Sequence, residues 1–365
     1  MRKIYLFALC ALVFLSCSNS RERLLTSATG SIYECLIVAP AGEAKEAACS
    51  TMGADMYGLP QMEPYFVVTS VTPAQFDDFF KSSRNILYLD INPNKYTQLK
   101  VLKSRNNWSK PQVLCRIQAP DEESFLTFWQ TNGEAVREWF VREEISRQIS
   151  FYRASTNKDA RKALNKQGYD LLIPEDYMLI MDTCLTSNSA AVSVVWCCNN
   201  KGPMRKDIVV YSYPYTAQEQ FSNDSIIAMR NQVLGKIVTA QVPGSHMGTE
   251  FKHFPPVSRS VPALPQYIQS NNNQSINNQS INNQSDNSSI QQSDNYFYAV
   301  ETRGLWKILD GEAMGGPFVS LTRLDQVNGR VVTAEAFLYA AGQKKRNALR
   351  QMEAILYSLQ MPNEH

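Results

Sequence analysis

The first seventeen residues constrain this chain most, because they separate a leader from the part that can fold. Arg2 and Lys3 are followed by an almost unbroken apolar run from Ile4 to Leu15. A positive start before an apolar run of this length is typical of a secretory signal. The run is too short to cross a bilayer, which takes about 20 apolar residues. We therefore expect residues 1–16 to be a signal peptide and the folded part to lie outside the cytoplasm.

Ser16 and Cys17 end the apolar run, and a small residue before a cysteine at this place resembles the lipobox of bacterial lipoproteins. In that class of protein the signal is cut before the cysteine, and its thiol carries a diacylglycerol. More than one acyl chain makes such anchoring stable, at about 0.8 kcal/mol per buried methylene. The alternative is an ordinary cleaved signal with an incidental cysteine. We expect lipidation of Cys17, with residues 17–30 as a polar tether. Because no acidic run follows the cysteine, we expect an outer-membrane lipoprotein that faces the periplasm.

The charge balance excludes one class of partner. The chain holds 36 basic and 34 acidic residues. Two of the basic residues lie in the leader, which leaves 34 of each sign and a formal charge of zero. A neutral chain offers no basic field for nucleic acid, so we expect no nucleic-acid partner. After the leader, no apolar stretch is long enough for a membrane span, so the lipid is the only membrane attachment we expect.

The cysteines and histidines do not predict a metal or cofactor site. The chain has no Cys-x-x-Cys pair, and its three histidines do not space with the cysteines. Beyond Cys10 and Cys17, five of the other six cysteines stand in apolar, strand-like runs, where a free thiol packs as a small hydrophobe. We expect mostly buried thiols, although disulfides are permitted outside the cytoplasm. The six are Cys35, Cys49, Cys115, Cys184, Cys197 and Cys198.

Apolar periodicity along the mature chain predicts an α+β fold of two similar-sized halves, residues 31–155 and 156–365. Each half combines strands with helices but lacks regular βα alternation, which favours mainly antiparallel or mixed sheets. The longest helix is expected over Asp121 to Phe151, with a break or kink at Thr131–Gly133. A short helix after Thr72 should bury Phe76, Phe79 and Phe80. Further strands are expected at 33–39, 65–71, 85–91, 112–117, 177–184, 191–198, 207–213, 296–302, 318–323 and 330–339, and further helices at 42–56, 158–166, 222–234 and 344–359.

A low-complexity insert interrupts the second half at about residues 258–295. Its centre, Asn271 to Asn295, is mostly Asn, Gln and Ser, and the unit Asn-Gln-Ser-Ile recurs. Such a segment cannot bury enough apolar surface to offset the entropy lost on ordering. We therefore expect a disordered surface insert.

Several short motifs in a fixed order resemble a family of uncharacterised lipoproteins from Bacteroidetes-type bacteria, known as a domain of unknown function. The resemblance covers roughly Tyr33 to Gln360 apart from the insert. It implies the localisation and the fold expected above, and no known reaction. His246 and the Cys197–Cys198 pair depart from the family pattern, so neither is a choice for a family-wide active site. The motifs that carry the resemblance are Gly58 to Phe66, Arg84 to Leu87, Trp108 to Gln112, Arg303 to Trp306, Met314 to Phe318, and Lys345 to Asn347 with Arg350, Glu353 and Ala354.

Candidate binding residues lie within these motifs. The glycines after Met314 could let backbone amides approach a ligand, or could form a tight turn. Lys344, Lys345 and Arg346 stand at an expected helix start, where cations oppose the helix dipole. Either an anionic partner or a nearby carboxylate such as Asp310 or Glu335 must offset that cost. The candidate binding surface comprises Glu63, Arg84, Arg303, Trp306, Met314, Arg346 and Arg350.

Two functions remain open from the sequence. The first is a membrane-anchored binding or assembly protein of the cell envelope, with an envelope protein, a lipid head group or a cell-wall ligand as partner. The second is a hydrolase or transferase of envelope polymers that uses paired carboxylates, Glu63 with Asp310 or Glu301. Two carboxylates that face each other across a cleft would favour the enzyme. A site lined by paired Arg and Glu without a free acid would favour binding.

Overall fold

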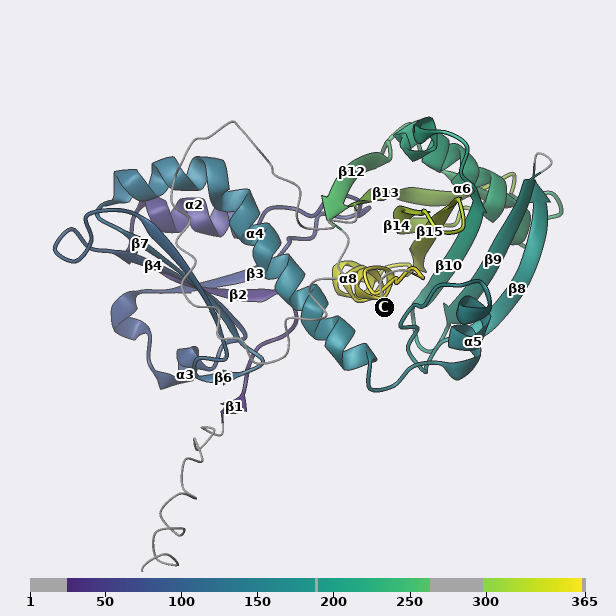
Figure 1. The fold of residues 1–365 in the computed structure, drawn as a ribbon. Helices are drawn as coiled ribbons and strands as arrows, with labels where there is room; N and C mark the ends of the chain where they lie inside the picture. The colour runs from purple at the N-terminus through teal and green to yellow at the C-terminus, as the bar shows by residue number, and fades with distance from the viewer. Residues whose placement is uncertain (1–24, 188–189, 263–297, 363–365) are drawn as a thin grey trace, which may run out of the picture.

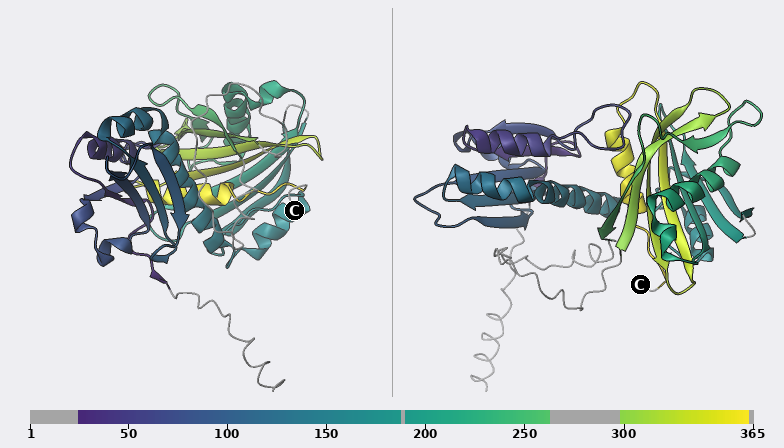
Figure 2. Two further views of the ribbon diagram at one scale, coloured as in Figure 1. Left: turned by 60° about the vertical axis from the view of Figure 1, so that its left-hand side comes forward. Right: turned by 90° about the horizontal axis from the view of Figure 1, so that it is seen from above.

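Two large β-sheets with helices packed against them, and a two-stranded sheet of β1 and β6, make up the described chain (Figures 1 and 2), so the predicted α+β class is confirmed. The computed structural model describes residues 25–187, 190–262 and 298–362. The expected lipidation site at Cys17 and the Asn271–Asn295 segment lie outside these residues. Two predicted bounds are wrong, because Val257–Pro262 form strand β12 at the start of the expected insert and Thr26–Ser27 form strand β1 within the expected tether. Among the described residues, no helix combines the length and the apolar content that a membrane span requires.

The N-terminal sheet is mixed, with its strands in the order β3-β2-β4-β7-β5. β2 runs parallel to β3 and β4, β4 runs parallel to β7, and β5 is antiparallel to β7. Parallel strands are covered on both faces, and here α2 and α4 cover one face while α3 and the 3-10 helix η1 lie toward the other. The bounds are β1 Thr26–Ser27, β2 Glu34–Val38, α2 Glu43–Met52, β3 Val67–Val71, η1 Pro73–Gln75, α3 Asp78–Lys81, β4 Asn85–Ile91, β5 Lys100–Arg105, β6 Ser109–Lys110, β7 Val113–Ala119 and α4 Glu122–Tyr152.

The C-terminal sheet is antiparallel, in the order β11-β13-β14-β15-β10-β9-β8, with β12 also paired to β13. Side chains alternate between its faces. Val332 and Ala334 of β15 join the core under α8, whereas Val331 and Phe337 pack with Val233 of α6. The bounds are α5 Lys158–Lys166, β8 Met178–Ser187, β9 Ala190–Asn199, β10 Arg205–Pro214, η2 Gln218–Phe221, α6 Asn223–Ile237, β11 His246–Thr249, β12 Val257–Pro262, β13 Tyr298–Leu309, β14 Gly315–Asp325, β15 Arg330–Tyr339 and α8 Arg346–Leu356.

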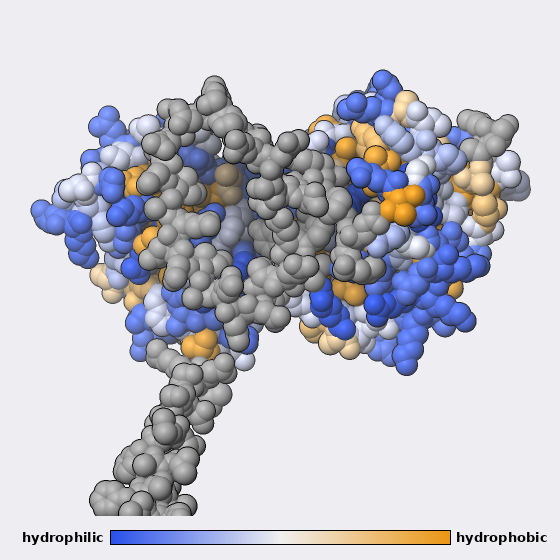
Figure 3. Space-filling model, viewed as in Figure 1, coloured by the Kyte–Doolittle hydropathy of each residue, from blue (hydrophilic) through white to orange (hydrophobic). Residues whose placement is uncertain are grey.

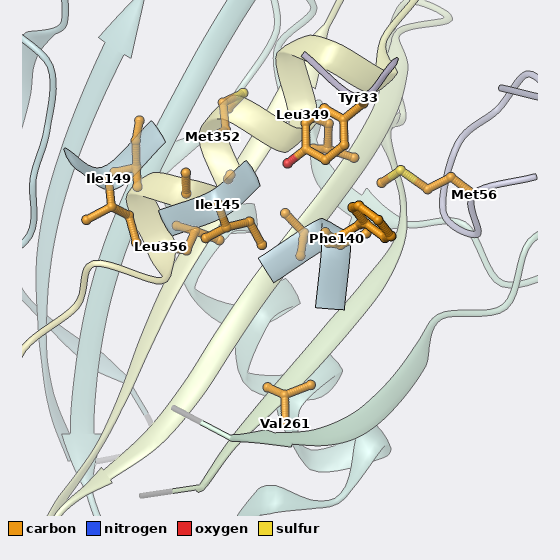
Figure 4. Packing of buried hydrophobic residues seen from close by; sticks show 14 of the residues in the cluster. Tyr33, Met56, Phe140, Ile145, Ile149, Val261, Leu349, Met352 and Leu356 are labelled. Carbon is orange, nitrogen blue, oxygen red and sulfur yellow. The ribbon is translucent and has the colours of Figure 1, made fainter. Parts of the chain in front are cut away.

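Helix α4 joins the two sheets into one core. Its first turns place Phe125 against the N-terminal sheet, and its last turns reach α8 of the C-terminal sheet. Figure 4 shows Ile145 and Ile149 of α4 beside Met352 and Leu356 of α8. One cluster of buried apolar side chains therefore runs through both halves of the chain. The division of the chain at residue 155 stays a prediction.

Of the break or kink predicted at Thr131–Gly133, the break is wrong. α4 is hydrogen-bonded as one helix from Glu122 to Tyr152, and Figure 1 shows it changing direction without interruption. Gly133 serves packing, because a Cβ there would lie 2.8 Å from the indole of Trp129. Asn132 donates from its side-chain amide to the Phe128 carbonyl at 3.0 Å, so it stays within the helix.

The segment after Thr72 also differs from expectation. It forms a 3-10 turn and the four-residue helix α3 instead of one helix. Phe76 and Phe80 pack against the apolar cluster on the outer face of the N-terminal sheet, but the side chain of Phe79 is 73% exposed. Asp77 caps α3 by accepting from the Phe79 and Phe80 amides.

All six cysteines in the described residues are free thiols. Cys35, Cys115, Cys197 and Cys198 are buried in strands, as expected, and burial raises the pKa of each thiol. Cys184 is exposed, and it lies on β8, the last strand of its sheet.

Candidate functional site

Five buried charged residues meet where the N-terminal loop 58–65, strand β13 and helix α8 come together. They are Glu63, Glu301, Arg303, Arg350 and Glu353, and none is more than 8% exposed. We call this set the junction network. It contains most of the charged residues that the sequence singled out for binding, and its partners all belong to this chain.

Glu63 caps the first turn of α8. Its two carboxylate oxygens accept from the backbone amides of Lys345 at 2.7 Å and Arg346 at 3.1 Å. A carboxylate at a helix N-terminus satisfies free amides and complements the dipole. Glu63 therefore offsets the cations at this helix start, and neither an external anion nor the expected carboxylates are required. Glu335 instead pairs with Arg230, and Asp310 stands exposed in the turn after β13.

Arg303 bridges two buried acids. It donates to Glu301 at 2.8 Å and to Glu353 at 2.6 Å, and Glu353 also accepts from Arg350 at 2.8 Å. Burial alone would raise the pKa of Glu301, but the charges of Arg303 and Arg259 outweigh it and hold that pKa well below its usual range. The Tyr357 hydroxyl completes the set by donating to Glu301 at 2.6 Å. Glu301 and Glu353 therefore each accept from charged donors within this chain.

Arg350 ties α8 to the N-terminal half. Its guanidinium lies over the rings of Tyr33, at 5.4 Å, and Tyr65, at 5.1 Å. Cation–π contacts of this kind strengthen when water is excluded. The backbone carbonyl of Pro64 also accepts from the Arg346 guanidinium at 3.0 Å. The junction network thus holds the loop before β3 against α8.

The other predicted binding residues lie elsewhere and are also engaged. Arg84 forms a two-pronged ion pair with Glu144 of α4, at 2.8 to 3.1 Å. Trp306 is buried and donates from its indole to the Leu338 carbonyl at 3.2 Å. Met314 packs on the apolar cluster beneath α6. The predicted residues do not form one exposed surface.

The carboxylate pairs proposed for catalysis are not supported by this geometry. Glu63 is occupied by two backbone amides, and Glu301 is occupied by two arginines and a tyrosine hydroxyl. Asp310 is exposed in a turn and has a positive φ of 53°. Within the described residues, no three His, Cys, Asp or Glu side chains are placed to hold a metal ion.

A groove of about 710 Å³ lies between the end of α4, the loop before β8 and the turn that joins β9 to β10. This volume is within the range of ligand sites, about 300 to 1,000 Å³. The floor includes Met352 of α8 and Tyr152, whose hydroxyl donates to the Gln351 carbonyl at 3.2 Å. The groove is lined by Gln148, Phe151, Tyr152, Ala154, Ser155, Pro174, Glu175, Asp176, Tyr177, Lys201, Lys206, Gln351 and Met352.

The groove differs from the junction network in its charges. Glu175 accepts from the Ser155 hydroxyl and Asp176 from the Asn199 amide, each at 2.5 Å, and both donors are neutral. Across the described residues, neither these acids nor Lys201 and Lys206 form an ion pair. The groove therefore presents both signs of charge to solvent.

An exposed aromatic ring marks one wall of the groove. The side chain of Phe151 is 71% exposed, while its neighbour Tyr152 is 8% exposed. Sequence reasoning placed Phe151 at the end of the long helix and gave it no role. Its position on the helix could have indicated its exposure. The buried residues Ile145, Ile149 and Tyr152 lie on one face of α4 at helical spacing, and Phe151 lies off that face.

Comparisons with known proteins identify two regions of the chain. Residues 28–153 match the model described as "Domain of unknown function (DUF8532)", and residues 155–358 match the model described as "Domain of unknown function (DUF4837)". No curated protein matches the chain. The groove is lined by both regions. Gln148 and Phe151 belong to the first region, and the lining residues of α8 and of the β9–β10 turn belong to the second. Since the second match covers more than half of the 365 residues, the chain belongs to the family described as domain of unknown function DUF4837.

Proposed function

We propose that this protein is a membrane-anchored binding protein of the cell envelope, whose groove holds a segment of cell-wall peptide. The observation that carries the proposal is the contrast in charge pairing. In the junction network, Glu301 and Glu353 form ion pairs inside the chain and Glu63 caps α8, whereas the groove keeps two acids and two lysines without ion pairs beside the exposed ring of Phe151.

The chemistry of the groove favours an extended ligand with both amino and carboxylate groups. Lys201 and Lys206 stand on the β9–β10 side, and Glu175 and Asp176 stand on the loop before β8. Charges in complementary positions fix the orientation of a ligand more than they add affinity. Phe151 supplies apolar area that a neighbouring side chain or sugar ring can cover. Stem peptides of the cell wall carry both charged groups on a short chain.

The membrane anchor is proposed from the leader. Lipidation of Cys17 would hold the groove close to the periplasmic side of the outer membrane. Metabolic labelling with radioactive palmitate tests this part alone. Label should enter the native chain and be absent from Cys17→Ala, which should leave the membrane fraction. An unlabelled native chain, or a Cys17→Ala chain that stays on membranes, would contradict the anchor.

Sedimentation with purified peptidoglycan tests the groove. The native chain should pellet with the polymer, and Lys201→Glu with Lys206→Glu should weaken this binding at least about ten-fold, since two attractive contacts become repulsive. A matched control reverses two exposed lysines of α5, Lys158→Glu with Lys162→Glu, and changes the net charge equally. Equal loss in both variants, or retention in both, would count against the groove as the binding site.

A further inference from the structure

The outer face of the N-terminal sheet carries an aromatic cluster beside the first described residues. Phe76 contacts Tyr88 at 5.6 Å and Trp108 at 5.7 Å between ring centroids, and Phe80 packs into the same cluster. Phe79 lies on Phe80 at 5.3 Å but projects away, with 73% of its side chain exposed. A single exposed aromatic ring is ordinary in itself, so the place of Phe79 in the fold is more informative than its exposure.

The chain enters the fold at this cluster. Strand β1 pairs with β6, which holds Ser109 next to Trp108. Thr29 is bound to the end of α3, because its amide donates to the Ser82 carbonyl at 2.9 Å and its hydroxyl lies 2.8 Å from that of Ser82. Figure 1 shows β1, β6 and α3 together at the lower end of the N-terminal half, and Figure 3 shows hydrophobic residues at the same edge.

The length of chain before this point limits the distance to the anchor. Eight residue steps separate Cys17 from Leu25. Fully extended, they span at most about 29 Å. A diacylglyceryl group on Cys17 would therefore keep close to the bilayer the α3 surface, which is bound to the entering chain through Thr29 and Ser82.

We propose that α3 rests on the bilayer, with the Phe79 ring inserted into the lipid interface. The inference rests on the anchor proposed above and adds an orientation: the outer face of the N-terminal sheet is turned toward the membrane. Aromatic side chains favour the interface between lipid and water. Asp77 and Asp78 flank the ring and Lys81 is paired with Asp78 at 2.8 Å. The contact therefore depends on apolar insertion and does not require anionic lipid.

Quenching by brominated lipid tests the contact on the full lipidated chain. Phe79→Trp and Phe151→Trp each place one added indole at a similarly exposed position, 73% and 71% for the native rings. Each variant is reconstituted in phosphatidylcholine vesicles with and without brominated chains, and the emission of the native chain is subtracted. Most of the added emission at position 79 should be lost with brominated lipid, and that at position 151 should remain. Adding phosphatidylglycerol should not change the result.

Flotation of the same samples separates the two proposals. A chain that floats with the vesicles while position 79 stays unquenched would overturn the contact of α3 and leave the anchor intact. Equal quenching at positions 79 and 151 would also overturn it, because the molecule would then have no fixed orientation. A chain that does not float would overturn the anchor and, with it, the contact.

Discussion

The junction network and the groove are built from the same types of residue and differ in how their charges are used. In the junction network, Arg303 lies between two acids at 2.8 and 2.6 Å and is 8% exposed. In the groove, Lys201 and Glu175 are exposed, and neither forms an ion pair among the described residues. Pairing and burial indicate a structural role, and exposure beside a cavity indicates a binding role. Substitutions should therefore separate stability from binding.

Removing the shared acid of the junction network should have the largest effect. Glu353→Ala leaves Arg303 and Arg350 buried beside a missing acceptor, and breaking a buried pair in this way costs about 3–5 kcal/mol. Denaturant unfolding followed by circular dichroism measures the loss. The comparison variant Glu175→Ala, in the groove, should stay within about 0.5 kcal/mol of the native chain. Similar losses in both would remove the distinction between the two regions.

Acid should destabilise the protein through its buried, paired carboxylates. The pKa of Glu301 is lowered because its arginines outweigh burial, and the pKa of Glu144 is lowered in the same way by Arg147 and Arg84. Their contribution to stability is present above the unfolded value of 4.5 and is lost as pH falls through the lowered folded value. The free energy of unfolding should fall between about pH 5 and pH 3.

The variant Glu301→Gln should flatten this dependence on pH, although it also lowers stability at neutral pH by weakening the pair with Arg303. The exposed Glu219→Gln controls for the loss of one carboxylate. The account is contradicted if Glu301→Gln keeps the native slope between about pH 5 and pH 3, the range in which this carboxyl takes up a proton in the unfolded chain but not in the folded one.

The helix cap should have an intermediate effect. Glu63→Ala removes the acceptor of the Lys345 and Arg346 amides and should cost about 1–2 kcal/mol, with Glu63→Gln recovering part of it through its amide oxygen. Hydrogen exchange should show faster exchange at the first turn of α8 than in the native chain. Unchanged exchange there would mean that the cations at this helix start are offset by something else.

The smallest effect on stability should come from the groove. Lys201→Glu with Lys206→Glu changes two side chains that form no ion pairs in the described chain, so the melting temperature should stay close to the native value. Thermal unfolding measures this. A large drop would show that the groove lysines support the fold, and the loss of peptidoglycan binding proposed for this variant could then not be assigned to contact with a ligand.

Helices and strands could be predicted from the sequence better than the contacts between side chains. Strands such as Asn85–Ile91 follow from continuous apolar runs, and α8 follows from the stripe of Leu349, Met352 and Leu356. Strand β5 was not predicted, because Lys100 to Arg105 is rich in charged residues. Charged residues are common on edge strands, where they prevent pairing with other chains. Local propensity also could not show that Gly133 is needed for the Trp129 ring, because that need arises from packing within the folded helix.

The candidate site was less predictable than the fold. Glu63 and Arg346 were selected as charged residues in short motifs, yet 283 positions separate Glu63 from the Arg346 amide that it caps. No local pattern reports a partner at that distance. The groove was missed for the same reason, because Phe151 and Lys201 meet only when α4 and the β9–β10 turn are placed together.

Site-specific photocrosslinking in intact cells tests the central claim most directly. A benzoylphenylalanine at position 151 lies in the groove, and one at position 62 lies beside the junction network, where Met62 is 86% exposed. The account predicts a crosslinked cell-wall peptide, identified by mass, at position 151 and none at position 62. Capture at position 62 alone would show that ligands meet the junction and would contradict the assignment of the groove.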